Sequence, residues 1–357
     1  SSCLIAKYTQ EDPFNGLAPK ERLAWEVPEL DLYHFWDLDA KHSIDIAKEC
    51  EEAALQQPEI DNSDGAEISS FEGESIYANS NGLVARAKNT KHSLHCSLIA
   101  KREREMQTAY EYSVALDAGE LFPAKQVGVE AARLAQQKLG SQDLSPQKCP
   151  ILFTPRQSTG LFSQLLGALS GSRQYKKTSF LLESLGEKVL PETISVFENP
   201  LQVKTIGARA FDTDGVMKRE QFFVEDGRVS SYIMGQYSAN QLGLGSTANA
   251  GGVSNCCISP NYSGGFKELI KDMDTGLIVT DLMGHGVNMT TGDYSRGASG
   301  FWVESGEIKY PVSGITIAGN LKHMLANVVH VGEDIDPRSN IKVGATLISE
   351  MTIAGED

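Results

Sequence analysis

The sequence lacks any apolar stretch that could cross a lipid bilayer as a helix. Its longest apolar runs, Thr275 to Met283 and Ile341 to Ile348, fall well short of the roughly 20 residues that such a helix needs. A membrane protein of the helical kind is therefore not predicted. The sequence also lacks an initiating methionine, since it begins at Ser1, and we expect it to be the later part of a longer chain.

Positive charge is scarce as well. The 357 residues include 32 lysines and arginines against 47 aspartates and glutamates, which gives a formal net charge of -15 at pH 7. The basic residues are scattered along the chain rather than clustered. A field of this sign repels phosphate backbones, so the composition predicts no direct binding to nucleic acid.

Cysteines are few and far apart, without the density of a disulfide framework or the C-x-x-C spacing of a metal knuckle. The neighbouring Cys256 and Cys257 would form at best a strained disulfide. We expect reduced thiols in a cytoplasmic protein at all six positions: Cys3, Cys50, Cys96, Cys149, Cys256 and Cys257.

The length favours two domains over one continuous core, because domains commonly contain about 100 to 200 residues. We predict an α+β fold. An N-terminal mixed α/β region with antiparallel strands, residues 1–143, is expected to precede a β-rich C-terminal domain, residues 149–357. The boundary is placed in the polar stretch from Ser141 to Cys149.

Helix and strand signals are mixed in the predicted N-terminal region. From Asp39 to Leu55 apolar residues recur at steps of three and four, which predicts an amphipathic helix capped by Asp39. A second helix is predicted from Pro123 to Gly140. Between them, serine-rich turns separate four runs that predict an antiparallel meander: Ser75 to Ala78, Gly82 to Lys88, His92 to Ala100 and Met106 to Leu116.

The C-terminal domain is predicted to contain one early helix and several hairpins. The helix covers Gln157 to Ser170, with an apolar face typical of a core element. Asp226-Gly227 and Ser305-Gly306 are pairs that tolerate positive φ between alternating apolar runs, and each predicts a hairpin turn. The first hairpin is expected to pair Gln221 to Val224 with Val229 to Met234.

Three short patterns have ordinary structural explanations. Gly243 to Ala248 fits a dinucleotide-binding pattern, but glycines follow where a phosphate-binding helix should begin, so a loop is predicted. His92 and His95 would point to opposite faces of a strand, which disfavours a shared metal ion. Ser299 lacks the strand-to-helix context of a hydrolase nucleophile.

The most unusual segment runs from Thr280 to Asn320 and is rich in glycine. Glycine is needed where the backbone takes positive φ or where another backbone approaches, so tight turns and close strand crossings explain it. The same bare backbone would also suit a groove wall to which an extended peptide adds as a strand. Five polar or aromatic side chains are the candidate groove residues: His285, Asp293, Tyr294, Ser295 and Arg296.

A family resemblance is centred on this segment, in GDYSRGASGFWVESGEIKYPVSGITIAGNL. It is similar to the C-terminal signature of the PmbA (TldE) branch of the TldD/PmbA peptidase family, which is also known as the modulator of DNA gyrase family. The resemblance extends along the chain through YTQEDPFNGLAPKE, LFTPRQSTGLFSQLLGALSGSRQYKKTSFLLESLGEKVLP and SNIKVGATLISEMTIAG. Family members carry a further segment before the part that resembles Ser1 to Lys20, so the first α/β lobe is expected to be incomplete.

The resemblance implies a bacterial metallopeptidase assembled from TldD-like and PmbA-like subunits that cleaves unfolded peptides. Maturation of the peptide antibiotic microcin and degradation of the CcdA antitoxin are the activities that it implies. The link to DNA gyrase would then act through toxin and antitoxin peptides, in keeping with the acidic composition.

The catalytic members of the family use a His-Glu-x-x-x-His helix and a distant cysteine to hold zinc. The corresponding positions here are Ser163, Gln164 and Ala168, and the region of the cysteine has Val343 and Gly344. A hydroxyl, an amide and a methyl group do not form a zinc site, and an amide is no general base. The resemblance therefore implies a chain without a metal, a cofactor or catalytic residues of its own, with zinc on the TldD-like partner.

Two alternatives remain open at this point. The chain could be an autonomous peptidase with a different site, for instance one built from His285, Asp293 and Ser295. It could also be a homodimeric peptide-binding protein without catalysis, which uses exposed strand edges to hold its ligands. A homodimer is also an expected state of the isolated chain.

Overall fold

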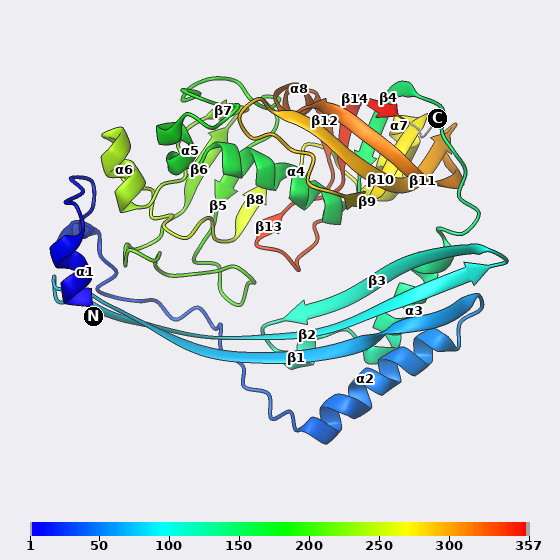
Figure 1. Ribbon diagram of the computed structural model, residues 1–357, viewed down its shortest axis with the longest axis horizontal. Coiled ribbons are helices and arrows are strands. Elements are labelled where there is room, and N and C mark those ends of the chain that lie inside the picture. The colour runs from blue at the N-terminus through cyan, green and yellow to red at the C-terminus, as the bar shows by residue number, and fades with distance from the viewer. Residues whose placement is uncertain (1, 355–357) are drawn as a thin grey trace.

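The computed structural model describes residues 2–354. A long three-stranded sheet forms one side of the molecule, with helices α2 and α3 on its outer face and the larger C-terminal part on the other side (Figure 1). The C-terminal part contains a six-stranded and a five-stranded sheet. The α+β architecture predicted from the sequence is confirmed.

The N-terminal region begins with α1 (Ser2–Tyr8) and the short 3-10 helix η1 (Lys20–Arg22), which an irregular stretch connects to α2 (Ala40–Leu55). The side chain of Asp39 caps α2, because its Oδ1 accepts a hydrogen bond of 2.7 Å from the backbone N–H of His42. A second 3-10 helix, η2 (Ala118–Glu120), leads to α3 (Ala124–Gln136). Both predicted helices and the predicted cap are thus confirmed.

The three-stranded sheet is the antiparallel meander that was predicted, but its strands are fewer and longer. It consists of β1 (Ile60–Ala78), β2 (Val84–Arg102) and β3 (Glu105–Ala115), paired in that order. The prediction of separate strands before and after Asn89 was wrong, because β2 runs through this point. Thr90 lies where the turn was expected, but it is buried, and its hydroxyl donates a hydrogen bond of 2.7 Å to the carbonyl oxygen of Leu116.

Successive side chains of β2 point to opposite faces of the sheet, and this explains how the sheet packs. Leu94, Cys96 and Leu98 point toward α2 and α3 and are buried against Cys50 and Val127. The residues between them face the opposite way, toward the C-terminal part. His92 and His95 have different partners, since the His92 ring lies 2.9 Å from both Ser70 Oγ and the His34 carbonyl oxygen, whereas His95 packs on Tyr110.

The C-terminal part has two sheets that share one apolar core with α4 (Pro155–Ala168). The six-stranded sheet has the order β11-β10-β9-β4-β14-β12, and the five-stranded sheet has the order β13-β8-β5-β6-β7. The strands are β4 (Gln147–Phe153), β5 (Val196–Glu198), β6 (Gln221–Glu225), β7 (Arg228–Val229), β8 (Cys256–Ile258), β9 (Gly276–Met283), β10 (Asp293–Glu304), β11 (Glu307–Asn320), β12 (Val328–Val331), β13 (Ile341–Lys342) and β14 (Thr346–Ala354). The other helices are α5 (Gly171–Lys176), α6 (Gln236–Leu242), α7 (Phe266–Met273) and α8 (Leu321–Ala326).

Both predicted hairpin turns are confirmed by their backbone geometry. Asp226 and Gly227 have φ of 47° and 75°, and Ser305 and Gly306 have φ of 54° and 70°, the left-handed values of a two-residue turn. The length of the first hairpin was predicted wrongly, because β7 ends at Val229. Beyond it the chain leaves the sheet and pairs with the end of α4, where the Ile233 N–H donates to the Leu169 carbonyl oxygen at 3.0 Å.

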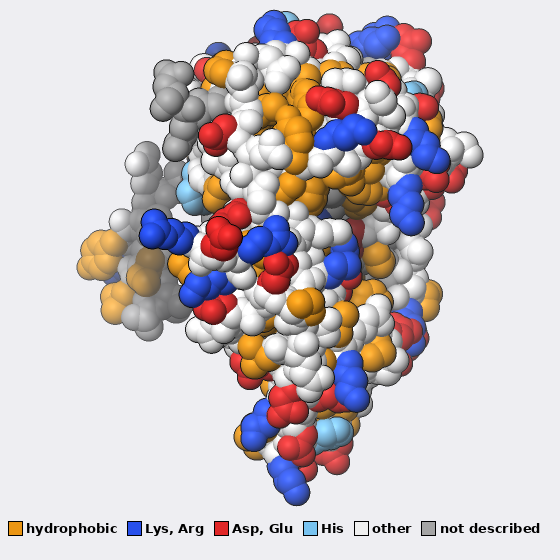
Figure 2. Space-filling view, turned by 90° about the vertical axis from the view of Figure 1, so that its right-hand side faces the viewer, with side chains coloured by type: hydrophobic (Ala, Val, Ile, Leu, Met, Phe, Trp, Pro, Cys, Tyr) orange, Lys and Arg blue, Asp and Glu red, His pale blue; other side chains and the backbone are white. Residues whose placement is uncertain are grey.

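The glycine-rich pattern, the cysteines, the apolar runs and the charged residues were the other features of the sequence. Gly243 ends α6 with a φ of 66°, and Gly243 to Ala248 is a loop, as predicted. Cys50, Cys96, Cys149, Cys256 and Cys257 form no disulfide, while the side chain of Cys3 lies outside the described residues. No helix in residues 2–354 is long and apolar enough to span a bilayer. Acidic and basic side chains are interspersed over the face shown in Figure 2.

Candidate functional site

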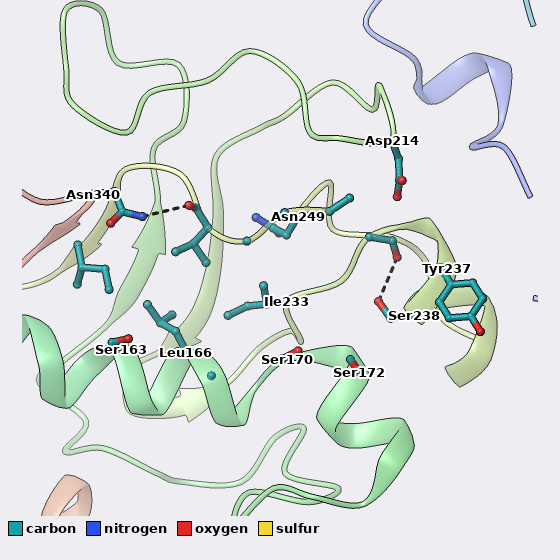
Figure 3. A pocket seen from close by; sticks show the side chains of 17 residues that line it. Ser163, Leu166, Ser170, Ser172, Asp214, Ile233, Tyr237, Ser238, Asn249 and Asn340 are labelled. Carbon is teal, nitrogen blue, oxygen red and sulfur yellow. Dashed lines mark hydrogen bonds between the residues drawn. The ribbon is translucent and has the colours of Figure 1, made fainter. Parts of the chain in front are cut away.

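Helix α4 forms one wall of an open cavity of about 630 Å³. Pro155 starts the helix, where its missing N–H costs nothing, and Leu161, Leu165, Leu166 and Leu169 are buried, as the sequence predicted. The other face of the helix presents Ser163 and Gly167 to the cavity. The wall continues through Ser170 and Ser172 into α5 (Figure 3).

The opposite wall comes from three segments that are far apart in sequence. Figure 3 shows Asp214, Asn249 and Asn340 across the cavity from α4, with Tyr237 and Ser238 of α6 at one end. The backbone of residues 249–253 forms the middle of this wall. Asn340 is joined to it, because its Nδ2 donates a hydrogen bond of 3.3 Å to the Val253 carbonyl oxygen.

A buried ion pair anchors this wall from behind. Glu198 and Lys218 have fully buried side chains, and Lys218 Nζ lies 3.0 Å from Glu198 Oε1. The same carboxylate accepts hydrogen bonds from Asn249 Nδ2 at 2.8 Å and from the Ser254 N–H at 2.6 Å. Burial lowers the pKa of Lys218. Since both ends of the 249–254 segment are bonded to β5, the wall is held in one position.

A second buried carboxylate fixes the neighbouring loop. Asp212 accepts hydrogen bonds from the backbone N–H groups of Asp214, Val216 and Ala250 at 2.9 to 3.0 Å. Burial raises the pKa of Asp212. Asp214, which lines the cavity, in turn accepts a hydrogen bond of 2.8 Å from the Gln236 N–H at the start of α6. The lining is therefore pre-organised, and it combines apolar side chains with hydroxyl and amide groups and glycine backbone.

The three positions that the resemblance aligns with a zinc motif lie in three different environments. Ser163 is exposed and lines the cavity, Gln164 is half-buried, and Ala168 is completely buried. Ile341, at the start of the segment aligned with the distant cysteine, lines the same cavity, while Val343 and Gly344 are buried. A hydroxyl, an amide and a methyl group do not fit zinc. Within residues 2–354, no three His, Cys, Asp or Glu side chains are grouped as a metal site.

The candidate groove residues of the glycine-rich segment lie at the start of β10 and in the turn before it. His285, Asp293 and Ser295 are exposed, and no hydrogen bond in the described part of the chain joins their side chains to one another. Tyr294 is buried, which raises its pKa to about 12, and Arg296 is half-buried. None of the five lines the cavity beside α4.

The segment nevertheless reaches α4 through Met289. The Cε atom of Met289 lies 3.4 Å from the position that a Cβ atom on Gly167 would occupy. The Phe180 N–H donates a hydrogen bond of 2.8 Å to the Met289 carbonyl oxygen, which fixes this approach. Since Gly167 lines the cavity, the turn that follows β9 packs against the same wall.

Sequence reasoning missed a second cavity of about 500 Å³ that adjoins the first. Val253 and Asn340 line both cavities. The other side chains come from β2 and β3, from the N-terminal part of α4, and from three loops: Lys91, Tyr112, Arg156, Thr159, Ile206, Arg209, Ser254, Asp336, Arg338 and Ser339. No local pattern marks these residues, because the fold brings them together from across the whole chain.

Two arginines of the second cavity join the C-terminal part to the three-stranded sheet. Arg156 donates to Glu111 at 2.8 Å, and Arg338 donates to the same carboxylate and to the Tyr112 carbonyl oxygen at 2.8 Å. Both guanidinium groups lie over the Tyr112 ring, at 4.9 and 4.4 Å from its centroid. Arg338 also pairs with Asp336 at 2.7 Å.

The chain matches two family models, the PmbA/TldA metallopeptidase central domain over residues 33–139 and the C-terminal domain over residues 146–355. It is 43% identical to the metalloprotease PmbA homolog of Haemophilus influenzae, covering 98% of this chain and 78% of that protein. The metalloprotease PmbA of Escherichia coli O157:H7 is also 43% identical, over 99% and 78%. A solved structure from Bacteroides thetaiotaomicron, described as a modulator of DNA gyrase, superposes with a TM-score of 0.92 at 28% identity, covering 98% and 80%.

Proposed function

This chain belongs to the TldD/PmbA metallopeptidase family, and within that family we propose that it is a subunit that holds unfolded peptides for a zinc-bearing TldD-like partner. In this proposal the partner supplies zinc and the general base. The chain described here supplies cavity walls that restrict which polypeptides reach the zinc and the base. The proposed location of this activity is the cytoplasm. Maturation of small peptides and degradation of unfolded antitoxins are the corresponding roles.

The observation that supports the proposal most directly is the chemistry of α4. Ser163 lines the cavity. The family resemblance aligns this position with a zinc-binding histidine of the catalytic members. A serine hydroxyl followed by an amide cannot hold zinc or deprotonate a metal-bound water. In this proposal α4 forms a wall of the cavity, and another polypeptide provides the zinc and the general base for hydrolysis.

The shape and polarity of the cavity suit a peptide backbone. Its wall at residues 249–253 contains Gly251 and Gly252, and no atom lies within 4 Å of the space where a Cβ on Gly252 would be. Bare backbone together with the amide of the exposed Asn340 offers hydrogen-bonding groups that do not depend on the side chains of the ligand. An unfolded segment of varied sequence is the ligand class that needs such a lining.

Reconstitution with a TldD-like subunit from the same organism tests the proposal. The purified chain with added zinc should not hydrolyse an unfolded peptide, whereas the mixture should form a hetero-oligomer on size exclusion and show chelator-sensitive hydrolysis. Robust chelator-sensitive hydrolysis by the chain alone would contradict the proposal. So would a mixture in which the two subunits elute separately and activity does not depend on this chain.

A second candidate is a homodimeric peptide-binding protein without catalysis. It is favoured by β1, which has 19 residues and, within residues 2–354, pairs with β2 alone, so that the backbone groups of its other edge face outward. An extended peptide or a second copy could add there. Co-purification from cells distinguishes the two candidates, because this one expects the chain to be isolated with itself and with peptides but without a TldD-like subunit.

A further inference from the structure

The second cavity is cationic in a chain that is strongly acidic. Four basic side chains line it, Lys91, Arg156, Arg209 and Arg338, against the single carboxylate of Asp336, although the whole chain has a net charge of -15. Since acidic residues dominate elsewhere, a local excess of positive charge needs a specific reason. Attraction of an anionic group into this cavity is the simplest one.

Two of the four cations are already neutralised by the protein. Arg156 pairs with Glu111 at 2.8 Å, and Arg338 pairs with Asp336 at 2.7 Å. Lys91 and Arg209 are exposed, and neither side chain makes a hydrogen bond or an ion pair with any residue in 2–354. The charge that remains available to a ligand is therefore theirs.

Arg209 lies where the two cavities adjoin. Its Nη1 atom is 3.8 Å from the position that a Cβ on Gly251 would occupy, and Gly251 lines the first cavity. Val253 and Asn340, which line both cavities, form the wall between them. A peptide in the first cavity would thus bring its next groups toward the guanidinium of Arg209.

The loop on the other side of the cavity is rigid. Lys342 is buried, and its Nζ donates hydrogen bonds of 2.5 and 2.6 Å to the carbonyl oxygens of Pro337 and Ser339. Asp336 also accepts a hydrogen bond of 3.0 Å from the Arg338 N–H. Because these hydrogen bonds already order the loop, binding of a ligand does not require that it be ordered. This favours a pre-formed binding site over a coincidental cluster of charges.

We propose that the second cavity is a subsite for a carboxylate of the bound peptide, recognised by Arg209 and Lys91. The carboxylate is either the C-terminal one or that of an Asp or Glu side chain. A guanidinium can bind it through two parallel hydrogen bonds, and an ammonium adds a point charge. The inference rests on the proposed function, and it adds that the peptides preferred by this subunit carry a negative group beyond the segment held beside α4.

The test uses fluorescein-labelled, unstructured peptides that differ only in carboxylates, measured by anisotropy with the full chain and with its TldD-like complex. One probe has a glutamate and an amidated C-terminus, one has glutamine and a free C-terminus, and one has glutamine and an amidated C-terminus. At least one carboxylate probe should bind about tenfold more tightly than the neutral probe, and the tighter one identifies the source of the carboxylate. Added salt should weaken this preference.

Arg209→Gln and Lys91→Gln should each reduce the preference, with little effect on binding of the neutral probe. Arg104→Gln is the matched control, because Arg104 is exposed and lines neither cavity, and it should keep the full preference. Equal binding of all probes, or a preference that survives both substitutions, would overturn the subsite while leaving the proposed function intact. If no probe bound to the chain or to its complex, the proposed function itself would fail.

Discussion

Single residues decide both the chemistry and the stability of the cavity wall. Ser163 places a hydroxyl in one wall of the cavity, and Glu198 and Lys218 hold the opposite wall through a charge pair that is out of contact with solvent. The assignment of Ser163, Gln164 and Ala168 to zinc-motif positions rests on the family resemblance and stays a prediction. The anchoring pair was not identified from the sequence, because Glu198 and Lys218 are 20 residues apart and neither lies in a recognisable pattern.

Lys218→Met should destabilise the protein strongly. The substitution removes the partner of Glu198 and leaves a buried carboxylate without its countercharge, a change that typically costs about 3 to 5 kcal/mol. Lys148→Met is the matched control, since Lys148 forms an exposed pair with Glu350 at 3.1 Å, and such pairs contribute about 1 kcal/mol or less. Urea unfolding measures the free energy of unfolding of both variants. Equal losses of this free energy in the two variants would refute the anchoring role.

Ser163→Trp should block the cavity without disturbing the core, because Ser163 is exposed and points away from the buried face of α4. Binding of a labelled unfolded peptide to the complex should weaken about tenfold or more, equivalent to at least 1.4 kcal/mol. Lys176→Trp, at an exposed position of α5 outside the cavity lining, should bind normally. Unchanged binding by the Ser163 variant at unchanged stability would mean that peptides do not use this cavity.

At the scale of elements, the helices and hairpin turns could be predicted because their signals are local. Asp39 caps α2, and the pairs at Asp226 and Ser305 take the left-handed conformation that their turns require. The extent of the strands was harder to predict. β2 continues through Thr90 because a buried hydrogen bond to Leu116 replaces a turn, and β7 stops early because the chain leaves to contact α4. Both outcomes depend on tertiary partners.

The packing of α2 on α3 gives a test at the same scale. A Cβ atom on Gly128 of α3 would lie 2.0 Å from the carbonyl oxygen of Cys50 on α2, so Gly128→Ala must push the helices apart. We expect a loss of roughly 1 to 3 kcal/mol or more in the free energy of unfolding. Gly160→Ala on α4, where no atom lies within 4 Å of the added methyl group, should instead stabilise by about 0.5 to 1 kcal/mol. Thermal and urea unfolding compare the two, and a stabilised Gly128 variant would contradict this packing.

At the scale of the whole molecule, the cavities exist only because distant parts of the chain meet. The first is lined by α4, α6, residues 249–253 and Asn340, and the second adds β2 and β3 from the N-terminal region. The sequence predicted the α+β fold, but it offered no means of seeing that Arg209 and Lys91 share one site. The five residues chosen from the glycine-rich segment lie outside both linings, although Met289 in the same segment packs against α4.

The location of zinc in the reconstituted complex is the most direct test of the account. The histidines of the motif in the TldD-like subunit are replaced, the variant is combined with this chain, and the bound zinc and the hydrolysis of an unfolded peptide are measured on the purified assembly. We expect the assembly to form with neither bound zinc nor hydrolysis, whereas the unaltered pair has both. Stoichiometric zinc and sustained hydrolysis in the altered assembly would place the metal on this chain and contradict the account.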